Sequence, residues 1–101
     1  MPIITPGYIH DNFVFTGFER SKNKKKKYDA VLFNANTGRY KRVPFGSKIP
    51  LYEQYKDTTG LKLYSKLDHG DKNRRRLYRL RHKHTYSKIF SPSYFSYHFL
   101  W

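Results

Sequence analysis

The sequence contains no cysteine, and it has only one methionine and one tryptophan among its 101 residues. The absence of cysteine excludes disulfides, thiolate zinc sites and cysteine nucleophiles. No apolar run approaches the roughly 18 residues that a membrane span needs, and the first residues lack the charged and apolar regions of a signal peptide. We therefore expect a soluble chain that is made inside the cell.

Acidic residues are also scarce, with 7 Asp and Glu against 21 Lys and Arg, and the net charge is +14. Such a charge repels itself in a compact chain and attracts polyanions or acidic protein surfaces. Aromatic residues are abundant instead, with 10 Tyr and 8 Phe. A chain this short has a small core, so we expect that core to consist mainly of aromatic rings. The high net charge leads us to expect that the protein works with a partner.

Residues 1–27 differ from the rest of the chain. Positions 1–20 carry two acids and one arginine, for a net charge of −1, and leave +15 on positions 21–101. This segment has prolines, glycines and no helical periodicity, which predicts an extended arm with at most a short strand at 13–18, followed by a lysine-rich loop. Its apolar side chains are candidates for docking on a partner: Ile3, Tyr8, Phe13, Phe15 and Phe18.

Residues 28–101 predict a small α+β domain. The stretches "YDAVLFN" and "RYKRVPF" flank the turn sequence "ANTG", which is typical of a β-hairpin. Leu51, Tyr52 and Tyr55 have the spacing of a short helical turn, and a helix is expected from Asp71 to Lys83. The expected architecture is a hairpin or three-stranded antiparallel sheet packed by this basic helix.

Two basic runs are candidates for binding a polyanion or an acidic partner. Guanidinium groups match phosphate oxygens in pairs, and aromatic side chains beside them can stack on bases. The same charges could dock on acidic patches of protein subunits, or could face water. The candidate residues are Lys24, Lys25, Lys26, Lys27, Arg74, Arg75, Arg76, Arg79, Arg81 and Lys83.

Asp68, His69 and Asp71 are the strongest candidates for acid–base or metal chemistry, since they lie within one turn. No second acidic cluster completes such a site, and both carboxylates suit the cap of the helix that follows. We therefore interpret Asp68 and Asp71 as helix caps. The sequence predicts no catalytic residue, metal or cofactor, and the protein is not expected to be an enzyme.

The end of the chain, "SPSYFSYHFLW", is too apolar for a frayed terminus. It is expected either to supply the core of a small domain or to insert into a partner. Phe99 and Trp101 are the candidates for the second role.

Three segments together resemble a family of small basic proteins encoded by large icosahedral DNA viruses, with relatives in some tailed phages. They are "PFG" at 44–46, "YEQYKDTTGLKLYSKLDHGDKNRRRLYRLRH" at 52–82 and "SYFSYHFLW" at 93–101. The resemblance covers roughly residues 28–101 and leaves 1–27 outside. It implies a viral origin and a particle-associated or nucleic-acid-associated role, and it transfers no catalytic residue.

The favoured expectation is a non-enzymatic structural component of a large DNA virus particle. A minor capsid protein that cements neighbouring subunits would use an extended arm to reach and a charged surface to orient. Its partners would be the major capsid protein or other capsid proteins, and its location the virion capsid. The alternative is a sequence-independent nucleic-acid-binding protein that condenses or escorts the viral genome.

Overall fold

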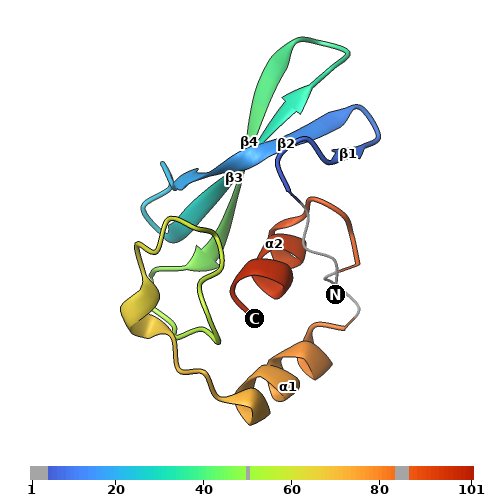
Figure 1. The fold of residues 1–101 in the computed structure, drawn as a ribbon. Helices are drawn as coiled ribbons and strands as arrows, with labels where there is room; N and C mark the ends of the chain where they lie inside the picture. Colours follow the sequence, from blue (N-terminus) through green and yellow to red (C-terminus); the bar gives the residue numbers. More distant parts are fainter. Residues whose placement is uncertain (1–4, 50, 84–86) are drawn as a thin grey trace.

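The computed structural model describes residues 5–49, 51–83 and 87–101, and it confirms a small α+β domain. Four antiparallel strands form one sheet in the order β1-β2-β3-β4. Their bounds are Ile9–His10, Phe13–Arg20, Lys26–Asn34 and Arg39–Ser47. A short 3-10 turn η1 (Ser65–Leu67) and two helices, α1 (Lys72–Arg81) and α2 (Pro92–Phe99), follow the sheet (Figure 1).

The predicted hairpin is present as β3 and β4. Tyr28, Ala30 and Leu32 alternate along β3 toward the core, where Tyr28 lies opposite Phe45 and Ala30 opposite Val43. Gly38 takes a φ of +70° in the connecting turn, which a residue without Cβ adopts freely. The expected helical turn around Leu51–Tyr55 is wrong, because this stretch has no helix and is held instead by a bridge between Gln54 and Asp68.

Within the described residues 5–27, β1 and β2 belong to the sheet, so an extended arm is not what the structure shows there. The short strand expected at 13–18 is present as part of β2. β2 pairs with β3 along its length and carries a bulge between Phe15 and Gly17. The bulge resets the alternation of side chains, and therefore Phe15 and Phe18 both contact the core. The sheet has one strand more than the three expected, since β1 adds two residues at the edge.

The sheet is covered by α2 and not by the basic helix, which corrects the predicted packing. Ser91 caps α2 by accepting a hydrogen bond from the backbone N–H of Tyr94 at 3.1 Å, and Pro92 starts the helix. Tyr94, Phe95 and Phe99 are buried on α2, and α2 packs against β4. The aromatic tail is therefore core, and α1 lies on the far side of α2 from the sheet (Figure 1).

α1 begins at a well-formed cap. The Asp71 carboxylate accepts hydrogen bonds from the backbone N–H groups of Asn73 and Arg74 at 2.9 and 3.2 Å. Asp68, in contrast, is not a cap of this helix: its carboxylate accepts from the Gln54 amide at 2.8 Å and the Asp57 N–H at 2.9 Å. One of the two predicted caps is thus replaced by a loop contact.

Replacing Asp71 by Ala is expected to destabilise the protein by about 1 kcal/mol, because two N–H groups at the start of α1 lose their acceptor. Urea unfolding checks this value. Asp71→Asn keeps an acceptor oxygen and is expected to retain most of the stability. An equal loss in both variants would show that the charge matters and the cap does not.

Candidate nucleic-acid interface

α1 presents one flank that is entirely cationic. Lys72, Arg75, Arg76 and Arg79 recur at helical spacing, and 100° per residue places them within about 100° of one another around the axis. Lys83 follows just beyond the helix. With Leu80 and Tyr97 these five residues line a hollow of about 460 Å³. We call Lys72, Arg75, Arg76, Arg79 and Lys83 the cationic stripe.

Two arginines of the cationic stripe are held in place by aromatic rings. The Arg75 guanidinium lies 4.3 Å from the centre of the Tyr55 ring, and that of Arg79 lies 4.6 Å from Tyr97. Arg79 Nη2 also donates to the Trp101 carbonyl at 3.1 Å. Stacking occupies the face of a guanidinium and leaves N–H donors along its edge, which are the groups that pair with phosphate oxygens.

The charge of the cationic stripe is not neutralised by neighbouring acids. Among the described residues, Arg74 is the only cation of α1 that has a carboxylate within 4 Å, and its Nη1 lies 3.6 Å from Glu53. Arg74 is on the opposite flank. The other arginine ion pair, in which Arg42 contacts Asp29 and Glu19, belongs to the sheet. The stripe therefore carries an uncompensated positive field.

The remaining predicted cations are divided between surface and interior. Lys24 and Lys25 are exposed in the β2–β3 turn, and Lys26 is half-buried at the start of β3. Lys27 is only 2 % exposed, which removes it from the candidate polyanion surface. The structure thus separates a run of four lysines that the sequence presents as one feature.

Lys27 belongs to a buried polar network that the sequence did not reveal. Its Nζ donates to the Tyr52 carbonyl at 2.7 Å and to Gln54 Oε1 at 2.8 Å. The Gln54 amide donates in turn to Asp68, and the Tyr28 hydroxyl donates to Asp57. These bonds attach the long segment after β4 to the sheet.

Burial in this network shifts two pKa values in opposite directions. Desolvation lowers the pKa of Lys27 to about 8, against the opposing attraction of Asp57 and Asp68. Desolvation, reinforced by the hydrogen bond to Asp57, raises the pKa of Tyr28 to about 12. Neither group faces the cationic stripe, so we interpret the network as structural.

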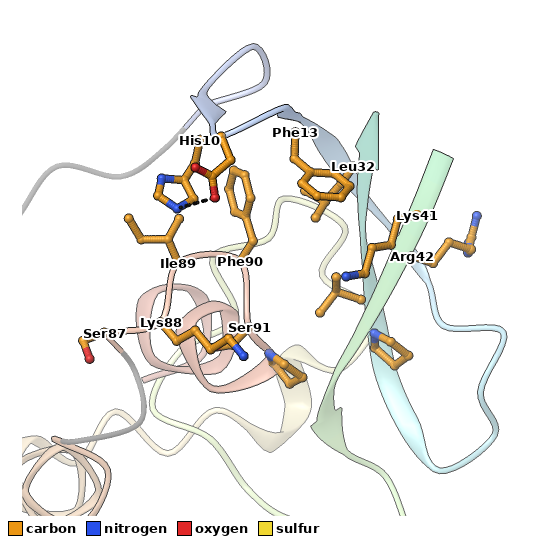
Figure 2. Close-up of a pocket in the computed structure, with 14 residues that line it drawn as sticks. His10, Phe13, Leu32, Lys41, Arg42, Ser87, Lys88, Ile89, Phe90 and Ser91 are labelled. Carbon is orange, nitrogen blue, oxygen red and sulfur yellow. Dashed lines mark ion pairs between the residues drawn. The ribbon is translucent and has the colours of Figure 1, made fainter. Parts of the chain in front are cut away.

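A second hollow, of about 670 Å³, lies between β4 and the segment 87–92 that leads into α2 (Figure 2). Its floor includes Leu32 and Phe90, and the amine ends of Lys41 and Lys88 point toward it. At its edge, His10 Nε2 lies 3.5 Å from Asp11 Oδ2. It holds fewer cations than the stripe, and its lining is largely apolar.

Several residues predicted to dock on a partner are placed in the core instead. Phe15 and Phe99 are buried among other rings, and Phe13, Phe18 and Trp101 are half-buried against the same core, which corrects their role. Tyr8 remains exposed beside β1. Ile3 lies outside the described residues.

His69 does not join a metal centre with the neighbouring acids. Its Nδ1 accepts a hydrogen bond from the backbone N–H of Asp71 at 2.9 Å. In the parts of the chain that the structure describes, no group of three His, Asp or Glu side chains could hold a metal ion. The residues that suggested acid–base chemistry are engaged in local hydrogen bonds.

Comparison with known proteins adds no relative, since no family model, curated protein or solved structure matches this chain. Among the described residues, no helix is long and apolar enough to cross a membrane.

Proposed function

We propose that this protein is a non-enzymatic, sequence-independent nucleic-acid-binding protein whose cationic stripe holds the phosphate backbone. The observation that carries this proposal is the flank of α1 on which Lys72, Arg75, Arg76 and Arg79 converge without a carboxylate. Guanidinium forks and an uncompensated field are what phosphate groups require.

Two features favour nucleic acid over an acidic protein surface. The stripe is bordered by aromatic rings, Tyr55 and Tyr97, that hold arginines at fixed positions. The whole chain carries +14, which supports long-range attraction to a polyanion. The side chains of the stripe are all cations, which contact phosphates of any sequence, and this favours binding without sequence preference.

The resemblance of residues 28–101 to small basic viral proteins supports a setting for this activity. In the particle of a large DNA virus, such a protein would condense or escort the genome. The proposal that it is not an enzyme rests on the use of Asp68, His69 and Asp71 in structural hydrogen bonds.

A minor capsid protein that binds the major capsid protein or other capsid proteins remains the second candidate. The main support for this second candidate is an extended N-terminal segment that could contact a neighbouring subunit. That support is weaker because β2 lies in the sheet. What supports it is the short edge strand β1, where Tyr8 and Ile9 expose apolar side chains that a neighbouring subunit could cover.

The salt dependence of DNA binding tests the first candidate. Lys72→Ala with Arg76→Ala removes two exposed cations of the stripe and spares the stacked arginines. The slope of log affinity against log salt for a duplex is expected to fall by about 1.8, since each lost phosphate contact contributes about 0.9. Titrations between about 50 and 200 mM salt measure this slope.

Lys24→Ala with Lys25→Ala is the matched control, because it removes the same charge from an exposed turn. Its slope is expected to stay close to that of the unmodified protein. Equal losses in the two double variants would show that total charge, and not the stripe, determines binding. That result would remove the main support for the proposed function.

A further inference from the structure

The flank of α1 opposite the cationic stripe borders a separate cavity. It has a volume of about 450 Å³ and lies between α1, the end of β4, the segment after β4 and the end of the chain. The residues that matter for its chemistry are Lys27, Tyr52, Arg74, Tyr78, Arg81 and Trp101. We call it the tryptophan pocket. Its volume lies within the range typical of small-ligand sites.

The tryptophan pocket is cationic. Arg74 and Arg81 line it from α1, and Lys27 lines it from β3. Glu53 is the acid at its edge, and the Glu53 carboxylate lies 3.6 Å from Arg74. This leaves Arg81 to attract an anion, since no carboxylate in the described ranges lies within 4 Å of Arg81 and the buried Lys27 amine already donates to Tyr52 and Gln54.

Aromatic rings supply the rest of the pocket wall. The Tyr78 and Trp101 rings are parallel within 4°, with centres 4.2 Å apart, and His82 stacks on Tyr78 at 4.2 Å. Burial lowers the pKa of the His82 imidazole, and the charge of Arg81 adds to the effect. Tyr52 is 60 % exposed, and its ring has no aromatic partner among the described residues.

We propose that the tryptophan pocket takes a single unstacked nucleotide of the bound strand, with the base on the exposed Tyr52 ring beside Trp101 and a phosphate near Arg81. This inference rests on the proposed function and adds a preference for single strands. Planar rings beside a guanidinium are the combination that recognises an unpaired nucleotide.

The position of the pocket explains why a duplex would not use it. The cationic stripe and the tryptophan pocket lie on opposite flanks of α1, which is about 10–12 Å wide with its side chains. A flexible single strand can cross the helix and reach both sites. A duplex is stiff over about 150 base pairs and keeps its bases stacked, so it can contact the stripe alone.

Trp101 is the only tryptophan of the chain and lines the pocket, so its fluorescence reports directly on occupancy. Titration of the full chain with a thymidine oligonucleotide is expected to quench this fluorescence. An abasic oligonucleotide of the same length carries the same phosphates without bases, and it is expected to bind the stripe without quenching. Equal quenching by both would overturn the inference.

Substitutions give a second readout. Tyr52→Ala with Arg81→Ala is expected to weaken single-strand binding about tenfold relative to duplex binding, because one base loses its stacking surface. Arg39→Ala with Tyr40→Ala is the matched control, since it removes the same residue types from the exposed far end of β4. Both double variants are expected to bind duplex with equal affinity.

The outcomes separate the two proposals. If the pocket variant and its control show the same ratio of single-strand to duplex affinity, the pocket does not hold a nucleotide, and the stripe proposal is untouched. If the stripe variant Lys72→Ala with Arg76→Ala binds duplex as its own control does, the proposed function fails instead.

Discussion

Replacing Phe95 by Ala is expected to lower the free energy of unfolding by about 3–5 kcal/mol. The Phe95 side chain is fully buried, and its ring centre lies 5.5–6.0 Å from those of four other phenylalanines that come from β2, β4 and the segment before α2. The cavity left by the ring cannot close easily, since its walls belong to three different elements. The total stability of a small domain is only about 5–15 kcal/mol, so this loss is a large fraction of the total.

Urea and thermal unfolding measure the effect, and the midpoint temperature is expected to fall by at least about 12 °C. Tyr40→Ala is the control, because Tyr40 is an aromatic residue that is 69 % exposed on β4. It is expected to cost much less than Phe95→Ala. Similar losses for both variants would contradict the placement of α2 as the cover of the sheet.

Lys27→Met is expected to change how stability depends on pH. The folded state holds the pKa of Lys27 at about 8, below its ordinary value of 10.5, because burial disfavours the charged form. Between these two values the unfolded chain binds the proton more strongly, so the stability of the unmodified protein rises with pH. A shift of this size corresponds to about 3 kcal/mol, gained between pH 8 and 10.5.

The difference in unfolding free energy between the unmodified protein and Lys27→Met isolates this contribution from other titrating groups. The unmodified protein is expected to gain stability relative to Lys27→Met as the pH rises from about 8 to 10.5. Lys24→Met, at an exposed position, is expected to show no such change. Parallel pH profiles for all three proteins would show that Lys27 is not buried as described.

Tyr28 opposes Lys27 at higher pH. Its pKa is raised from 10.0 to about 12, so the unfolded chain loses the phenol proton first and stability falls over that interval. The two residues are neighbours on β3, and both bond to the segment after β4. The attachment of that segment to the sheet is therefore expected to be strongest near pH 10.

The hairpin could be predicted because its pattern is local. Alternating apolar residues around "ANTG" determine strands and turn without reference to the rest of the chain. A short strand was expected at 13–18, but its pairing with β3 was not, because the bulge at Gly17 interrupts the period of two between Phe15 and Phe18. The net charge of residues 1–20, which is only −1, also made this segment look separate from the basic domain.

The relation of the two helices to the sheet depends on tertiary packing. Leu77 and Leu80 of α1 are both exposed, while the shorter α2 carries the aromatic residues that fill the core. The tail was expected either to form core or to insert into a partner, and the sequence could not decide between them. For a small domain with few aliphatic residues, burying the rings of this tail is the more stable solution.

The candidate site was predicted in part. The arginines of α1 were recognised from sequence as one basic run, but their division between two flanks of the helix, and the place of Lys72 in the stripe, came only from the structure. The four lysines Lys24–Lys27 were predicted to form one binding run, but only the first three are exposed or half-exposed, and Lys27 is buried. Its partners Tyr52 and Gln54 lie 25 and 27 positions away, so no local pattern could reveal the network.

The most direct test of the central claim is a map of the nucleic-acid contact on the labelled full chain, by following backbone amide resonances as a short oligonucleotide is added. The cationic stripe is predicted to show the largest changes, at Arg75, Arg76 and Arg79, with Tyr97 of α2 beside them. Changes concentrated in the turn at Lys24 and Lys25, or spread evenly over all exposed lysines and arginines, would contradict it.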